Sequence, residues 1–121
     1  LCPLHKIKKI MSDLAEKKCI PSKEGIPPFD INEIHKYLKK INGWNVSNDK
    51  NKNFFIEKGF KFNNYIASEI FVIKVGEIAE AEGHHPDISF GWGYAKIKIS
   101  THSIKGLAES DFVLAAKIDR L

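Results

Sequence analysis

Histidines gather in one short part of this chain. Three of the five histidines are His84, His85 and His102, and the first two lie next to each other between Gly83 and Pro86. Glycine and proline on either side predict that the pair lies in a connection after a helix. An imidazole can accept or donate a proton near neutral pH. This clustering is therefore typical of acid–base chemistry.

Two further patterns bear on these histidines. Glu80 precedes His84 by four residues, one helical turn, which predicts that its carboxylate orients the His84 ring. In the last predicted strand, the alternation puts His102 on the same side as Lys96 and Lys98, away from the apolar side. A histidine buried in the core for structural reasons is therefore disfavoured at that position.

The spacing leaves three interpretations open. In the first, His84, His85, His102 and Glu80 bind zinc or iron, although adjacent histidines rarely both reach one ion. In the second, the same side chains carry out acid–base catalysis without a metal. In the third, they are surface residues without a role. Spacing alone ranks the first two interpretations about equally.

Hydrophobic periodicity and turn residues predict the elements that hold these side chains. The expected helices cover residues 4–18, 31–41, 64–82 and the segment after Gly106. The expected strands cover residues 44–46, 54–62, 88–92 and 94–101. Two hairpins separated by helices indicate an α+β domain, in which helices cover one face of an antiparallel sheet.

The long helix over residues 64–82 is apolar on much of its circumference. Ile66, Ile70 and Ile73 form one row that ends at Glu77. Other apolar side chains widen this row, and they include Val75. The sequence predicts that this broad face covers the sheet.

Composition restricts the class of protein. The chain has 121 residues, 43% of them hydrophobic, and a formal charge of +4 that comes almost wholly from dispersed lysines. Dispersed lysines argue against nucleic-acid binding, and no apolar run approaches the roughly 20 residues of a membrane helix. Two cysteines, Cys2 and Cys19, suit a reducing compartment such as the cytoplasm. We expect residues 1–10 to be an extension and residues 11–121 one domain, for which self-association would bury more apolar surface.

Several motifs resemble the pterin-4a-carbinolamine dehydratase family. They are Glu80-x-x-x-His84-His85-Pro86, followed by Trp92, His102 and Asp111. The run STHSIKGLAESDFVLAAKID (residues 100–119) resembles the C-terminal block of that family. Gly43-Trp44-Asn45 and residues 17–29 are similar to its N-terminal part. The resemblance covers nearly everything after residue 11.

The resemblance implies a fold and an activity. It implies a four-stranded antiparallel sheet, a tetramer or dimer, and neither a metal nor an organic cofactor. It implies that the chain dehydrates a pterin substrate, 4a-hydroxytetrahydropterin, to quinonoid dihydropterin, a step that recycles tetrahydrobiopterin. A rival function is also implied, because animal members serve as dimerisation cofactors of a homeodomain transcription factor, which would place the chain in the nucleus as well.

We assign provisional roles on this basis. His84 and His102 are the acid–base pair, His85 positions the pterin, and Glu80 orients His84. The remaining predicted site residues are Trp44, Pro86, Thr101, Ser103 and Asp111. Trp44 either stacks on the pterin or plugs the sheet edge. Thr101 and Ser103 offer backbone groups to the pterin, and Asp111 anchors the loop that carries His102.

Overall fold

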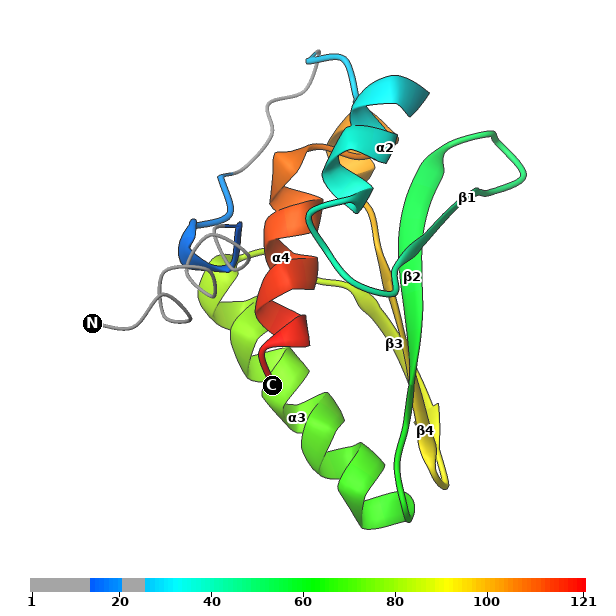
Figure 1. The fold of residues 1–121 in the computed structure, drawn as a ribbon, viewed down its shortest axis with the longest axis vertical. Coiled ribbons are helices and arrows are strands. Elements are labelled where there is room, and N and C mark those ends of the chain that lie inside the picture. The colour runs from blue at the N-terminus through cyan, green and yellow to red at the C-terminus, as the bar shows by residue number, and fades with distance from the viewer. Residues whose placement is uncertain (1–13, 21–25) are drawn as a thin grey trace.

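The computed structural model describes residues 14–20 and 26–121 (Figure 1). In chain order the elements are η1 (Leu14–Glu16), α2 (Ile31–Leu38), β1 (Asn45–Asn48), β2 (Phe54–Lys61), α3 (Tyr65–Glu82), β3 (Asp87–Gly91), β4 (Tyr94–Ile99), η2 (His102–Ile104) and α4 (Glu109–Asp119). The strands form one antiparallel sheet in the order β1-β2-β4-β3, and the helices lie on one side of it (Figure 1). The predicted α+β architecture is confirmed.

The central strand β4 separates the two faces of the sheet. Ala95, Ile97 and Ile99 are at most 1% exposed, and they point into the core beneath the helices. Lys96 and Lys98 alternate with them on the opposite face, as the sequence predicted. The end of β4 therefore leads directly to the open side of the sheet, where His102 follows.

The long helix α3 begins and ends where the sequence predicted. The Asn64 side chain accepts a hydrogen bond from the backbone N–H of Ala67 at 2.8 Å, which caps the first turn. Gly83 ends the helix in the left-handed conformation, with φ of 64°. A glycine adopts this conformation without the steric cost that a Cβ imposes.

The prediction for the buried side of α3 was right for Val75, which was expected to widen the buried face, and wrong for the row of isoleucines. Phe71, Val75 and Ala79 face the core, whereas Ile66, Ile70 and Ile73 are 48–64% exposed. Because α3 is apolar on nearly every side, periodicity alone could not choose which row meets the sheet.

The first part of the chain differs from the prediction in two ways. The helix expected over residues 31–41 ends at Leu38, because the following residues tighten into i→i+3 turns such as the Ile41 N–H to Leu38 carbonyl bond of 3.3 Å. The helix expected over residues 4–18 falls mostly outside the described residues, as does the extension expected at residues 1–10. The described part of the helix expected over residues 4–18 contains only the short 3₁₀ turn η1.

None of the helices in the described ranges is both long and apolar enough to span a bilayer.

Candidate active site

The end of α3 determines where His84 points. The backbone N–H groups of Gly83 and His84 donate to carbonyls in the last turn of α3, from Glu80 at 3.3 Å and from Ala79 at 3.1 Å. The left-handed Gly83 then reverses the chain direction. His84 consequently leaves the helical row and turns toward the start of α4.

A buried carboxylate holds the His84 ring. Asp111 in the first turn of α4 is fully buried, and its Oδ1 lies 2.7 Å from Nε2 of His84. Its Oδ2 accepts hydrogen bonds from the Thr101 hydroxyl and the Ala108 backbone N–H, both at 2.8 Å. An ionised carboxylate can only accept, so Nε2 carries the hydrogen and Nδ1 remains for a ligand.

The predicted contact between Glu80 and His84 is absent from the structure. Glu80 Oε1 instead lies 2.8 Å from Nε2 of His85, and both side chains are largely exposed. The i to i+4 geometry of a helix no longer applies beyond Gly83, so the row that carries Glu80 does not reach His84. Asp111 therefore has the orienting position that the sequence assigned to Glu80.

One cavity brings the three histidines together. It has a volume of about 280 Å³, and its lining residues are Gly83, His84, His85, Ser100, Thr101, His102 and Ser103. The end of α3 supplies the first two histidines and the end of β4 supplies the third. His85 and His102 are exposed and the His84 side chain is 15% exposed, so each ring lies outside the core. We call this space the histidine cavity.

Thr101 has a different place from the predicted one. Its backbone N–H donates to the Gly106 carbonyl at 2.8 Å, and its carbonyl accepts from Ile104 and Gly106 at 3.3 Å. Because these backbone groups already have partners, they do not offer the pterin the free contacts that the sequence predicted. The Thr101 hydroxyl binds Asp111 instead, which ties the segment before His102 to α4. This agrees with the anchoring role predicted for Asp111.

Trp44 lies in the core and does not line the histidine cavity. It is 6% exposed, its Nε1 donates to Oδ2 of Asp119 at 2.9 Å, and its ring meets Phe60 edge-on at 6.3 Å. The structure therefore favours the plugging role over stacking on a ligand. Pro86 is half-buried beside His85 but does not line the histidine cavity.

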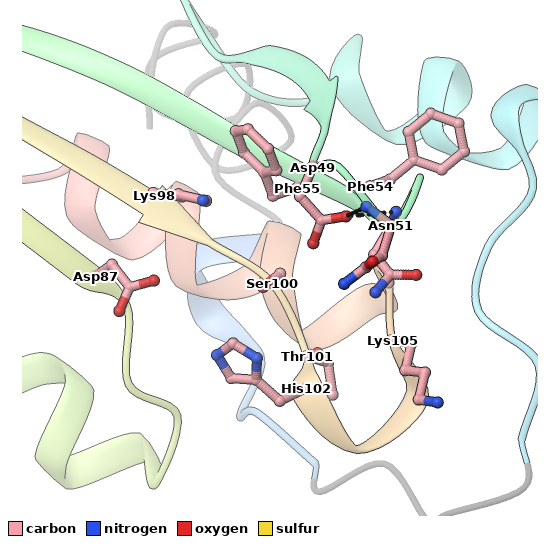
Figure 2. A pocket seen from close by; sticks show the side chains of 12 residues that line it. Asp49, Asn51, Phe54, Phe55, Asp87, Lys98, Ser100, Thr101, His102 and Lys105 are labelled. Carbon is pink, nitrogen blue, oxygen red and sulfur yellow. Dashed lines mark hydrogen bonds between the residues drawn. The ribbon is translucent and has the colours of Figure 1, made fainter.

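A second cavity on the other side of His102 was not predicted. It has a volume of about 270 Å³ and extends beneath the loop between β1 and β2, from which Asp49, Asn51 and Asn53 contribute (Figure 2). His102, together with Ser100 and Thr101, lines both cavities. We call the second space the loop cavity. The sequence showed only a polar loop there, without a pattern linking it to the histidines.

The metal interpretation finds no matching cluster in the described ranges. There, no group of three or more His, Cys, Asp or Glu side chains is placed to share one ion. Of the four predicted ligands, Glu80 pairs with His85, whereas His84 pairs with Asp111, which is outside the predicted set.

A short segment before α2 braces the ends of α3 and α4. The Cys19 backbone N–H donates to Oε1 of Glu82 at 2.8 Å, and Ile20 exchanges hydrogen bonds with the Ser110 hydroxyl. The Cys19 hydrogen bond holds the pKa of Glu82 below its usual value in spite of partial burial, and Lys117 adds to this effect. Glu82 and Ser110 directly precede Gly83 and Asp111, so this brace adjoins the site.

The thiol of Cys19 is held in its neutral form. Burial, followed by the negative charge of Glu82, raises the pKa of Cys19 from 9.0 to about 12. A thiol is a nucleophile only as the thiolate, so Cys19 is expected to be unreactive and to serve the brace.

Solved structures share this fold. A structure from Brucella melitensis, titled a transcriptional coactivator/pterin dehydratase, superposes with a TM-score of 0.68 and 24% identity, covering 77% of this chain and 96% of that one. A pterin dehydratase-like protein, titled a RuBisCO assembly factor of the alpha-carboxysome, has a TM-score of 0.55 and 24% identity over 65% of this chain and 88% of that one. At this identity the likeness concerns the fold alone.

Relatives found by sequence share a higher identity with this chain than these two solved structures do. A pterin-4-alpha-carbinolamine dehydratase family protein of Rubrobacter xylanophilus is 48% identical over 92% of this chain and 100% of its own length. A relative in Alkaliphilus metalliredigens is 46% identical over 91% of this chain and 96% of its own. The family profile described as Pterin 4 alpha carbinolamine dehydratase matches residues 27–121. The chain therefore belongs to the pterin-4-alpha-carbinolamine dehydratase family.

Proposed function

We propose that this protein dehydrates 4a-hydroxytetrahydropterin to quinonoid dihydropterin and water in the histidine cavity. Family membership supports the substrate class. The observation that carries the proposal is the His84–Asp111 pair at 2.7 Å, which lies on the same cavity as His102. A buried carboxylate that orients an imidazole is a recurring device for moving protons.

The reaction breaks two bonds of the pterin, N5–H and C4a–O, and forms two, the second bond between N5 and C4a and an O–H bond of water. N5 of the pterin loses its proton, the electron pair forms the N5=C4a double bond, and the C4a–O bond breaks. The leaving hydroxyl takes up a proton and departs as water. Since hydroxide is a poor leaving group, a base at N5 and an acid at the hydroxyl both lower the barrier, each by roughly 10²–10⁴ in rate.

We assign these two tasks to His84 and His102, and the His84–Asp111 contact supports the assignment of the base. His84 has its Nε2 hydrogen on Asp111, so its Nδ1 accepts the N5 proton and the carboxylate stabilises the imidazolium that forms. His102 protonates the leaving hydroxyl. Because His102 is exposed, it then recovers a proton from solvent, and His84 returns the N5 proton to solvent, so that both rings are ready for the next turnover. His85 and Glu80 at the rim position the ring, and the product re-enters tetrahydrobiopterin recycling in the cytoplasm.

A stopped-flow assay with freshly generated 4a-hydroxytetrahydropterin tests this proposal. The wild-type chain should accelerate dehydration over buffer, and His84→Ala should lose at least about 100-fold of that rate while keeping its circular dichroism spectrum. His35→Ala is the matched control, because His35 is exposed on α2 and lines neither cavity. Equal rates with and without the wild-type protein would reject the function. Elemental analysis tests the metal alternative, which one essential ion per chain would support.

The exposed row on α3 supports a second proposal, that the chain forms a homo-oligomer. Ile66, Ile70 and Ile73 form a continuous apolar strip. Glu69 and Lys74 are exposed on opposite flanks of this strip, which gives it opposite charges along its two edges. Such edges suit pairing with a second copy of the same surface.

Light scattering measures this association directly. The wild-type protein should have the mass of a dimer or tetramer, and Ile70→Glu should shift it toward the monomer mass of 13.7 kDa. Lys36→Glu on the exposed side of α2 is the control for adding an acidic residue. A monomeric wild-type protein would refute self-association. A transcription-factor partner stays a prediction from the family.

A further inference from the structure

The brace formed by residues 14–20 connects the ends of α3 and α4 (Figure 1, in blue). At α3, the Glu82 carboxylate accepts a hydrogen bond from the Cys19 N–H at 2.8 Å. At α4, the Ser110 hydroxyl accepts a hydrogen bond from the Ile20 N–H at 3.1 Å and donates one to the Ile20 carbonyl at 2.7 Å. The brace therefore ties the last turn of α3 to the first turn of α4.

An ion pair between the two helices strengthens this connection. The Lys117 ammonium lies 3.7 Å from Oε2 of Glu82, and the two side chains are 19% and 17% exposed. The same ammonium donates a hydrogen bond to the Ala15 carbonyl at 2.8 Å. Leu14 and Ala15 are themselves buried, so the brace is packed against the domain as well as hydrogen-bonded to it. Low exposure reduces the solvent screening that makes most surface ion pairs weak.

The two members of the His84–Asp111 pair depend on the brace to different degrees. Asp111 is fully buried, and the Thr101 hydroxyl and the Ala108 N–H also bind its carboxylate. His84 follows α3 directly, and its backbone N–H donates to a carbonyl in the last turn of that helix at 3.1 Å. The His84 ring therefore moves with the end of α3, and Glu82 ties that end to the brace.

We propose that Glu82 and Ser110 are positioning residues of the dehydration, which hold His84 at hydrogen-bond distance from Asp111 through the brace. This inference rests on the proposed dehydratase function, because that function makes the His84 ring the base. If the ring shifts on its carboxylate, its Nε2 hydrogen is no longer fixed, and Nδ1 is available to N5 in a smaller fraction of molecules. A displacement of about 1 Å can lower a rate by about 100-fold.

Steady-state kinetics with 4a-hydroxytetrahydropterin and NMR spectra of the His84 ring nitrogens test the proposal together. Glu82→Ala removes the acceptor of the Cys19 N–H, and kcat should fall by about 10- to 100-fold while KM changes by less than about threefold. The same variant should show a second tautomer of neutral His84 beside the Nε2–H form. Glu82→Gln keeps an acceptor oxygen and should restore part of both signals. Ser110→Ala should show the same changes to a smaller extent.

Two controls separate positioning from stability. Lys17→Ala alters the brace at an exposed ion pair of 3.3 Å and should keep the wild-type kcat and His84 spectrum. Asp119→Ala removes the acceptor of Trp44 and Lys58 at the other end of α4. It should therefore lower thermal stability while the folded protein keeps its kcat and its His84 spectrum.

The outcomes distinguish the positioning role from the function itself. A wild-type kcat in Glu82→Ala, or a loss of kcat without a change in the His84 spectrum, would overturn the positioning role and leave the dehydratase function standing. Equal losses of kcat in Glu82→Ala and Asp119→Ala would also overturn it, because lower stability would then explain both. If the wild-type protein does not accelerate dehydration, the dehydratase function fails and the positioning role fails with it.

Discussion

Oδ1 of Asp111 lies 2.7 Å from Nε2 of His84, and Asp111 is fully buried while His84 reaches the cavity. The same carboxylate accepts hydrogen bonds from Thr101, beside His102, and from Ala108 at the start of α4. One buried side chain therefore fixes a histidine from the end of α3 and the segment that carries the histidine after β4. This connection makes Asp111 central to the geometry of the site.

Asp111→Asn should lower kcat strongly while most of the protein stays folded. The amide keeps the size of the carboxylate, but it no longer stabilises the His84 imidazolium and can force the ring into the wrong tautomer. We expect kcat to fall roughly 10²–10⁴-fold, with KM changing much less. Stopped-flow kinetics and thermal unfolding on the same sample measure both effects.

Glu80→Gln provides the comparison for Asp111. The Glu80–His85 pair is exposed, so its loss should change kcat by less than about 10-fold. The positioning role of Asp111 would be refuted if Asp111→Asn and Glu80→Gln had similar effects on kcat, or if the loss in Asp111→Asn matched its loss of folded protein.

His85→Ala should act mainly on substrate binding. His85 is exposed at the rim and pairs with Glu80 rather than with the buried carboxylate. We expect KM to rise by about 10-fold and kcat to fall less than it does in His84→Ala. Steady-state kinetics on both variants check this order, and a larger loss of kcat in His85→Ala would reverse the roles of the two histidines.

Glu82 should make stability depend on acidic pH. Its pKa is lowered in the folded state, first by the Cys19 N–H hydrogen bond, so ionised Glu82 stabilises the fold above its unfolded pKa of about 4.5. This contribution is lost as the pH falls through the lower folded pKa. Glu82→Gln should therefore cost about 1–2 kcal/mol in the free energy of unfolding at pH 7, and less near pH 3.

Urea unfolding at the two pH values measures this difference. Glu16→Gln is the control, because Glu16 is exposed and lies 3.8 Å from Arg120, a pair that contributes little. A destabilisation by Glu82→Gln that stays constant from pH 7 to pH 3 would contradict the claim that ionised Glu82 stabilises the fold through its hydrogen bond from Cys19.

Cys19 should resist alkylation in the folded protein. With a pKa of about 12 instead of 9.0, its thiolate fraction at pH 7 is roughly 1,000-fold smaller than that of an unperturbed thiol. In a Cys2→Ser background, mass spectrometry after iodoacetamide treatment should show slow labelling of native protein and rapid labelling in denaturant. Equal rates in both conditions would show that the brace leaves Cys19 accessible.

Much of the framework could be predicted from local patterns. Asn64 and Gly83 mark the two ends of α3 because a cap and a left-handed turn have distinct residue preferences. The alternation in β4 separates its buried isoleucines from Lys96 and Lys98 because neighbouring strand residues face opposite ways. The same parity correctly placed His102 outside the core.

The partners of the histidines could not be predicted in the same way. The helical spacing pointed to Glu80 for His84, but the reversal at Gly83 directs that ring to Asp111 on a distant helix. The loop cavity likewise depends on the β1–β2 loop reaching the end of β4. Both relationships join segments far apart in the chain, and a local pattern carries no information about them.

A double-mutant cycle on His84 and His102 tests the central claim most directly. If the two imidazoles act as base and acid in one step, single-turnover dehydration by the double alanine variant should be about as slow as by the slower single variant. The folded state of all three variants is checked by circular dichroism. Losses that multiply fully, or a single variant with wild-type rate, would contradict a shared proton-transfer step.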